Sequence, residues 1–162
     1  MYNMPLFVND YINSDSIGNT FDVIYDDLEL VNYFGEISVS PSEELTFNVK
    51  ANYNDYIMAN EVKAWHKPSF SMSFTTKYNL RQKIILKGDI LAIGKRYIKL
   101  NYLGGFTELE SSIDINIGAE YRYSKVLSGF VQLNNLLSDG YYEWNYYPTY
   151  GFNILVGLTY SF

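Results

Sequence analysis

The single histidine of the chain is the first residue to consider for catalysis or metal binding. His66 lies in the segment KAWHKP, and the sequence contains no cysteine and no second histidine. A histidine-dependent triad or an imidazole metal site would need a nucleophile or further ligands nearby, and the segment supplies none. We therefore expect His66 to pack or to hydrogen-bond to neighbouring backbone, and we expect no catalytic residue, metal or cofactor in this chain.

Two groups of carboxylates are candidates for calcium binding. Asp26, Asp27 and Glu29 lie in VIYDDLEL, and Asp10 and Asp15 lie in NDYINSDS. Neither group has the spacing of a known calcium loop, so the sequence predicts solvated, charged extensions of strands. Paired carboxylates for glycoside chemistry can always be chosen from 18 Asp and Glu, and such a choice carries no information. Nothing in these residues indicates an enzyme.

The aromatic segment DGYYEWNYYPTY is a stronger candidate for binding. Aromatic rings offer a large contact area with a polar tip, so they could stack on sugars or on a partner protein outside the cell. They could equally pack a loop against the rim of a barrel, or form an aromatic belt at a membrane surface. The sequence leaves both hypotheses open for Trp65, Tyr141, Tyr142, Trp144, Tyr146 and Tyr147.

The rest of the chain alternates between apolar and polar side chains, as half-buried β-strands do. In IDINIGAEYRY the isoleucines oppose aspartate, asparagine and glutamate, and GFNILVGLTYSF alternates in the same way. We expect no helix and eight strands, at residues 2–8, 31–39, 45–53, 69–78, 84–92, 113–123, 127–135 and 151–162. In the two best patterns the residues predicted to face lipid are Ile113, Ile115, Ile117, Ile154, Val156 and Leu158.

Connections between these strands alternate between two lengths. The short ones are residues 40–44, 79–83 and 124–126, and the long ones are residues 9–20, 55–68, 94–110 and 138–151. Outer-membrane barrels have short periplasmic turns and longer extracellular loops, so the alternation is typical of that class. The sequence predicts an all-β, antiparallel, up-and-down transmembrane β-barrel of eight strands.

Composition agrees with a membrane protein that crosses with strands. Aromatic residues make up 18% of the chain and charged residues only 19%, against about 25% in a typical soluble domain. The net charge is -6 and the twelve basic residues are scattered, which argues against nucleic acid as a partner. No apolar run reaches the length of a transmembrane helix, and MYNMPLFVND lacks the pattern of a signal peptide. We expect a cytosolic protein, a mature chain or a fragment.

A soluble β-sandwich, or a soluble barrel that binds an apolar ligand, would also show period-two strands. In such a protein the apolar face would lie against a core. Two features favour the membrane instead. Large aromatics such as Tyr53, Tyr78 and Tyr121 lie near strand ends, where an interfacial girdle would be, and the opposite face is rich in Ser, Asn, Thr and Gly with charges of both signs.

The carboxy-terminal segments resemble a known family. LTYSF, with Tyr160 and Phe162, resembles the signal that the barrel assembly machinery reads on a last strand. Residues 63–97 and 129–162, and above all NNLLSDGYYEWNYYPTYGFN, resemble the carboxy-terminal strands of TonB-dependent receptors of the Bacteroidetes type. The resemblance implies nutrient uptake at the outer membrane of a Gram-negative bacterium. It implies as partners the lipid bilayer, the assembly machinery and, through a plug domain that this chain lacks, TonB.

Two architectures then remain for residues 1–162 as a single barrel domain or barrel segment. The eight strands could close into a small stand-alone barrel with an adhesive or structural role, or they could be the last strands of a larger receptor barrel. Pro5 removes a ladder donor from the first strand, where it would have to pair with the last, so we favour the segment. The charges expected to balance inside the barrel are Glu36, Asp89, Asp114 and Glu120 against Lys50, Lys77, Lys87 and Arg122.

Overall fold

The computed structural model describes residues 2–10, 20–100, 105–138 and 140–162. These residues form strands, turns and irregular connections, and they include no helix long and apolar enough to cross a bilayer. The strands are β1 (Tyr2–Asp10), β2 (Thr20–Val39), β3 (Leu45–Met58), β4 (Phe70–Leu80), β5 (Ile84–Ile93), β6 (Arg96–Leu100), β7 (Gly105–Leu109), β8 (Ser112–Arg122), β9 (Leu127–Asn134), β10 (Tyr142–Trp144), β11 (Tyr147–Pro148) and β12 (Asn153–Tyr160).

Eight strands form one antiparallel sheet in which each strand pairs with the next along the chain, in the order β1-β2-β3-β4-β5-β8-β9-β12. All eight predicted strands are present, although residues 31–39 are only the second half of β2. The short strands β6 and β7 form a hairpin that joins β1 through one parallel bridge, between Asn9 and Leu100. A second small hairpin, β10–β11, lies apart from the sheet.

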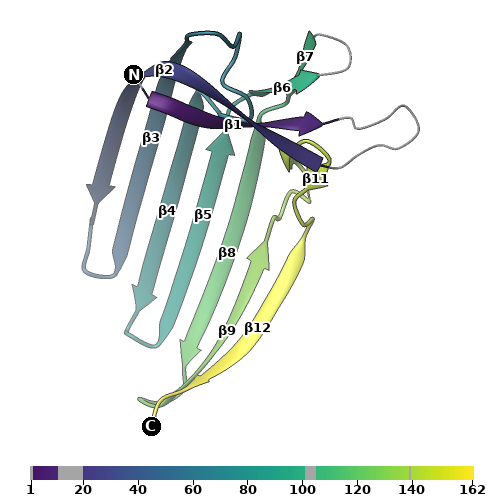
Figure 1. The fold of residues 1–162 in the computed structure, drawn as a ribbon. Coiled ribbons are helices and arrows are strands. Elements are labelled where there is room, and N and C mark those ends of the chain that lie inside the picture. The colour runs from purple at the N-terminus through teal and green to yellow at the C-terminus, as the bar shows by residue number, and fades with distance from the viewer. Residues whose placement is uncertain (1, 11–19, 101–104, 139) are drawn as a thin grey trace.

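The sheet is curved but open (Figure 1). Within the described residues β12 pairs only with β9, while β1 pairs with β2 and touches β6, so the first and last strands do not meet. The prediction of an up-and-down antiparallel sheet is confirmed. Of the two architectures left open, closure of these eight strands into a small barrel is not found, because no ladder joins β1 to β12 in the described residues; open edges are what the favoured alternative, a segment of a larger barrel, requires.

Tight turns gather at one end of the sheet and long connections at the other (Figure 1), as the spacing of the strands predicts. We call these the turn end and the loop end. At the turn end, Lys83 N–H donates to Leu80 C=O over 3.0 Å, and Arg81 and Gln82 between them have φ of 51° and 57°. Such two-residue hairpin turns favour Asn-Gly, because a side chain at positive φ costs about 1–2 kcal/mol.

Cross-strand register places the apolar residues of neighbouring strands on one face. Residues opposite each other in an antiparallel pair share a face. One continuous apolar row runs across five strands: Ile37, Val49, Phe74, Ile90 and Ile115. Ile154 and Val156 of β12 extend the same face through Leu133 and Val131 of β9. The face assignment made from the sequence is therefore self-consistent across the sheet.

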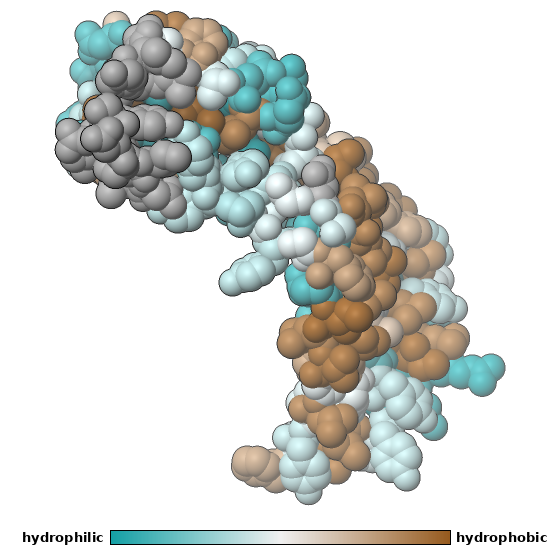
Figure 2. Space-filling view, turned by 90° about the vertical axis from the view of Figure 1, so that its right-hand side faces the viewer, coloured by the Kyte–Doolittle hydropathy of each residue, from teal (hydrophilic) through white to brown (hydrophobic). Residues whose placement is uncertain are grey.

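This apolar face is uncovered. Ile113 and Ile117 are each 48% exposed and Leu158 is 81% exposed, whereas Asp114 and Glu120 on the opposite face are half-buried. Figure 2 shows apolar side chains gathered along the sheet below a polar loop end. A soluble sandwich would have the reverse arrangement, with the isoleucines sealed under a second sheet. No second sheet lies on them within the described part of the chain, so the structure does not support that alternative.

Aromatic rows bound the apolar face. Near the turn end, Tyr78, Tyr121 and Tyr160 lie on it; near the loop end, Tyr53 pairs with Phe70. Phe70 and Tyr78 are eight residues apart on β4. That is about 27 Å along the strand, or about 20 Å across a bilayer at a tilt of 35–45°, which is close to the apolar band of an outer-membrane barrel.

The conventional core is small and lies at the loop end. The β1–β2 hairpin crosses this end of the sheet (Figure 1), and Leu6, Val8 and Trp65 pack together with almost no exposed surface. Ile24, Met58 and Tyr97 are packed against them. The loop end thus has an interior of its own, separate from the exposed face of the sheet.

The polar face shows part of the predicted charge balance. Lys50 pairs with Glu36 over 3.3 Å, and Arg122 with Glu120 over 3.1 Å. Lys77 instead lies opposite Lys87, and Asp89 lies opposite Asn116. Four of the eight charges expected to balance thus form two ion pairs in the described residues, while Lys77 and Lys87 face each other across β4 and β5.

Candidate functional site

The loop end is built around Trp65, from the connection between β3 and β4. Its ring packs on Leu6 and Val8 of β1, and its Nε1 donates to Glu61 Oε2 over 2.9 Å. Lys99 of β6 donates to both oxygens of Glu61 over 2.7 and 2.9 Å. The sequence predicted Trp65 as a possible external contact. The structure places it in the core, so its ring is not available at the surface.

Asp26 fixes the same connection to β2. Its carboxylate accepts bonds from Glu61 N–H over 2.7 Å, from Asn60 N–H over 3.0 Å and from Asn60 Nδ2 over 2.7 Å. These donors, the Glu61 backbone first, hold the pKa of Asp26 below its ordinary value. Asp26 was predicted to be solvated and is instead buried; its hydrogen bonds replace the water that its carboxylate would otherwise need. Asp27 and Glu29 are exposed, as predicted. Asp15 lies outside the described residues, as does the side chain of Asp10.

His66 follows Trp65 and turns to the other side of the β1–β2 hairpin. Its Nδ1 donates to Phe7 C=O over 2.9 Å, its backbone N–H donates to Tyr97 C=O over 2.8 Å, and its φ is 58°. The expected bond to backbone is confirmed. Nε2 is buried and has no partner among the described residues. Burial lowers the pKa of His66, and the charge of Arg96 lowers it further against the opposing effect of the Phe7 carbonyl.

Arg96, at the start of β6, is a buried cation that the sequence did not single out. It is 2% exposed, and its Nη1 donates to Glu143 C=O over 3.1 Å. Its Nε and Nη2 have no hydrogen-bond partner within the described residues. Burial lowers the pKa of the guanidinium. Two nitrogen-bearing side chains, Arg96 and His66, are thus buried at the loop end with unused polar atoms.

An apolar pocket of about 330 Å³ opens on the outer side of the hairpin. Phe7, Phe21, Trp144 and Tyr147 line it. Trp144 lies 5.6 Å from Phe7 and 5.7 Å from Phe21, and Tyr147 stacks on Phe21 at 5.4 Å, as ring centroids. His66 lies 5.0 Å from Trp144. The cavity could hold an aromatic or apolar group, because its wall is wholly aromatic; His66 contacts Trp144, and Arg96 bonds to the carbonyl of the preceding residue, Glu143.

The six predicted aromatic contact residues therefore do not act as one group. Trp144 and Tyr147 reach the pocket, while Trp65 lies against the opposite face of β1, because successive strand residues point to opposite sides. Tyr142 and Tyr146 are exposed, and burial raises the pKa of the half-buried Tyr141. Trp144 packs its loop against the hairpin, in agreement with the packing hypothesis; contact with an external ligand stays a prediction. Phe7 and Phe21 were missed, since nothing in the sequence relates them to residue 144.

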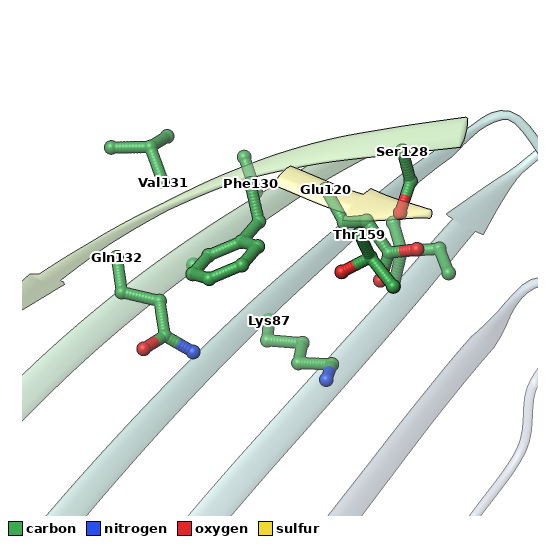
Figure 3. A pocket seen from close by; sticks show the side chains of 10 residues that line it. Lys87, Glu120, Ser128, Phe130, Val131, Gln132 and Thr159 are labelled. Carbon is green, nitrogen blue, oxygen red and sulfur yellow. The ribbon is translucent and has the colours of Figure 1, made fainter. Parts of the chain in front are cut away.

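A second pocket, of about 320 Å³, lies on the polar face of the sheet (Figure 3). Lys87, Glu120, Gln132 and Thr159 line it with the ring of Phe130 among them, while Val131 points away. Phe130 occupies the space over Gly157, where an added Cβ would lie 2.5 Å from its Cζ. Mixed charges around one ring suit a wetted interior surface rather than a catalytic site.

Metal binding finds no support in the described residues, which bring together no three His, Asp or Glu side chains suited to hold an ion.

The residues predicted to face lipid behave as a set. Ile154 and Val156 are exposed, as Ile113, Ile117 and Leu158 are, and Ile115 lies in the apolar row between them. Tyr160 and Phe162, the predicted assembly signal, are also exposed.

No family model matches the chain. No curated protein matches it either. The fold is similar to parts of solved receptor structures. The ferripyoverdine receptor of the outer membrane of Pseudomonas aeruginosa matches with a TM-score of 0.70 and 17% sequence identity, over 98% of this chain and 23% of that one. The ferric-catecholate import receptor Fiu of E. coli K12 matches with a TM-score of 0.74 and 13% identity, over 96% of this chain and 23% of that one, and the siderophore receptor PiuA of Acinetobacter baumannii with a TM-score of 0.69 and 12% identity, over 98% and 24%.

This chain thus spans about a quarter of the length of the structures it matches. At these identities the likeness shows the fold alone. The fold it shows is that of barrel strands from proteins described as receptors, and none of the three is described as an enzyme.

Proposed function

We propose that this chain forms part of the wall of an outer-membrane β-barrel in a Gram-negative bacterium, within a TonB-dependent receptor for nutrient uptake. One observation carries the proposal: the apolar face of the sheet is continuous across the strands and uncovered, while the opposite face is polar and half-covered. In water this arrangement is unfavourable. In a barrel the apolar face contacts acyl chains and the polar face lines the interior.

The open edges of the sheet favour a segment of a larger barrel over a stand-alone one. An unpaired edge strand in a bilayer leaves backbone groups without partners, and barrels avoid this by closing. β12 and β1 do not pair with each other in the described residues, so further strands would have to complete the ladder. In this proposal the assembly machinery reads Tyr160 and Phe162, and TonB acts through a plug domain supplied by other parts of the protein.

Ligand capture is assigned to the loop end, which faces the outside if the turns are periplasmic. The aromatic pocket with Trp144 and Tyr147, beside the buried Arg96 and His66, is the candidate contact surface. The similar structures are described as receptors for ferripyoverdine, ferric catecholates and siderophores, so ferric siderophores are the first class to test. Replacing Trp144 with Ala should lower uptake of such a ligand without lowering the amount of receptor in the membrane.

These 162 residues contain no cysteine, so a single cysteine introduced here reports orientation once any cysteine elsewhere in the polypeptide is replaced by serine. The exposed Val62 at the loop end and Ser42 at the turn end are replaced by Cys in the full polypeptide that carries this chain, expressed in a Gram-negative host. A membrane-impermeant maleimide should label Val62→Cys on intact cells. It should label Ser42→Cys only after the outer membrane is opened.

Three results would contradict the proposal. Equal labelling of both positions on intact cells would show that the sheet does not span the membrane, and labelling of the turn end alone would invert the orientation. Recovery of the parent protein folded in plain buffer, without detergent, would place the apolar face against something other than lipid. The parent polypeptide with its other cysteines replaced by serine, and with no cysteine introduced, is the control for nonspecific labelling.

A further inference from the structure

The turn end contains a concave, basic surface that the proposed function does not use. A pocket of about 520 Å³ is formed by two neighbouring turns, and its lining is Arg81, Gln82, Lys83, Arg122, Tyr123, Ser124 and Lys125. We call it the turn-end pocket. It gathers four of the twelve Lys and Arg of a chain whose net charge is -6.

Backbone contacts hold the two turns together. Arg122 N–H donates to Lys83 C=O over 2.8 Å, which ties the end of β8 to the start of β5. Ser124 Oγ accepts the N–H groups of Val126 and Leu127 over 3.3 and 3.1 Å and closes the second turn. The backbone of both turns that carry the cationic side chains is therefore held by hydrogen bonds.

Most of this charge is unneutralised. Arg122 pairs with Glu120, but Arg81, Lys83 and Lys125 form no ion pair within the described residues. The turn between β2 and β3 carries Glu43 and Glu44 instead. Positive charge is thus a property of these two turns and not of the whole turn end.

Chain conformation at Arg81 and Gln82 points the same way. Both residues adopt positive φ in the two-residue turn after β4, where glycine or asparagine would be favoured. The turn therefore keeps a cationic side chain at a position where a smaller residue would fold more easily. Backbone strain of this kind is often found at functional positions, so it is consistent with a binding role for Arg81.

The turn-end pocket adjoins the turn-side limit of the apolar face. Tyr121 and Tyr160 mark the turn-side limit of the apolar face, and Tyr123 belongs to the pocket lining itself. Aromatic belts lie at the level of lipid headgroups. Continuity with the lipid-facing surface and unpaired positive charge together match a molecule that has acyl chains and an anionic phosphate.

We propose that the turn-end pocket binds the headgroup of an anionic phospholipid from the leaflet on the turn side of the membrane. This inference rests on the proposed function, since it needs the apolar face in a bilayer. Arg81 and Arg122 can donate two parallel N–H bonds to phosphate oxygens, and Lys83 and Lys125 add point charges. A bound headgroup would anchor the wall at a fixed depth.

The test uses the full polypeptide that carries this chain, reconstituted in bilayers of phosphatidylcholine with spin-labelled lipid. Electron paramagnetic resonance measures the fraction of labelled lipid that is motionally restricted, for phosphatidylglycerol and for phosphatidylcholine. We expect at least about threefold preference for phosphatidylglycerol, reduced to near equality in the variant Arg81→Ser/Lys83→Ser/Lys125→Ser and by raised salt. The variant Lys63→Ser/Lys67→Ser/Lys95→Ser removes equal charge from the loop end and should keep the preference.

The outcomes separate the two proposals. Absence of restricted lipid of either kind would contradict the proposed function, because the wall would then not contact the bilayer. Restricted lipid without headgroup preference, or a preference that the loop-end variant abolishes, would overturn the inference alone. Inorganic phosphate, added to phosphatidylcholine bilayers and followed by calorimetry, should show no comparable binding; saturable binding there would assign the pocket to free phosphate. Arg81→Lys, which keeps the charge, should retain the preference and guards against misfolding as the cause.

Discussion

The two halves of β2 follow different rules although they are one continuous strand. In residues 31–39 one face is apolar and largely exposed, and the other is polar apart from Phe34, as expected of a membrane wall. In residues 20–30 apolar side chains lie on both faces: Leu28 is buried beside the Leu6 core, and Phe21 contacts Trp144. An apolar row on a strand therefore becomes a core only where another part of the chain packs against it; otherwise the same row stays exposed.

Polar groups differ between the same two regions. At the loop end Asp26 is buried and held by several N–H donors, and Arg96 is buried with unused nitrogens. Along the wall the ion pair between Lys50 and Glu36 is half-exposed. The loop end therefore resembles the interior of a water-soluble protein, where removing the partner of a buried polar group lowers the free energy of unfolding. The polar groups of the sheet are partly exposed, so losing one partner there should cost less.

The largest effect is expected from truncating the loop-end core. Leu6→Ala removes a side chain with no exposed surface and should lower the free energy of local unfolding at the loop end by about 2–5 kcal/mol, because a cavity remains. Hydrogen exchange of β1 amides in a bilayer measures it. Ile117→Ala, on the exposed face, is the matched change and should cost less than half as much. Similar costs at both sites would erase the distinction between the two regions.

A charge on the apolar face should be next in size. Ile115→Arg, and Val156→Arg on the last strand, should each destabilise the folded protein in a bilayer by about 2–4 kcal/mol, since both lie between the aromatic rows. Urea titration in lipid vesicles measures the loss. Asn116→Arg, one residue along, places the same charge on the polar face. Equal damage at residue 116 would invert the face assignment.

A smaller effect is expected where the polar face is tightly packed. Gly157→Ala would bring a Cβ to 2.5 Å from Phe130 Cζ, so the ring has to move, at a cost of about 1–3 kcal/mol. Gly35→Ala is the control, because nothing lies within 4 Å of the added atom. The same vesicle titration compares them. If residue 35 is as sensitive as residue 157, strand glycines are limited by backbone freedom rather than by the Phe130 contact.

Acidification should give the smallest change, confined to the loop end. The folded state holds the pKa of His66 below its ordinary value of 6.5, so above that pH both states are neutral and stability is unaffected. As pH falls through 6.5 the unfolded chain binds the proton first, and loop-end stability declines until the folded-state pKa is passed. Hydrogen exchange at residues 64–67, measured at pH 7.5 and 5.5, should show the decline in the parent and not in His66→Gln. A decline in wall strands instead would point to carboxylates there.

Much of the eight-stranded sheet could be predicted from sequence because it has one apolar face and one mostly polar face, which gives a period of two. The first half of β2 escaped prediction for the opposite reason. Ile24 and Leu28 face the core while Phe21 and Val23 lie on the other face, so the alternation is lost. The short strands β6, β7, β10 and β11 lie inside long connections and are too brief to show any period.

The candidate site was only partly predictable. Trp144 and Tyr147 stand out in an aromatic-rich segment, but Phe7 and Phe21 come from a hairpin whose position over the loop end depends on tertiary packing. The burial of Arg96 and Asp26 has no local signal, because each depends on partners at least 34 residues away. Strand count alone left closure open, because it does not determine whether the first and last edges meet; Pro5 in the first strand was the signal that favoured an open segment.

The β1–β2 hairpin packs against Trp65 on one face and against Trp144 on the other. The backbone N–H of His66 donates to Tyr97 C=O. Three long connections therefore share a single support. A substitution that shifts this hairpin should therefore disturb the packing of all three connections together.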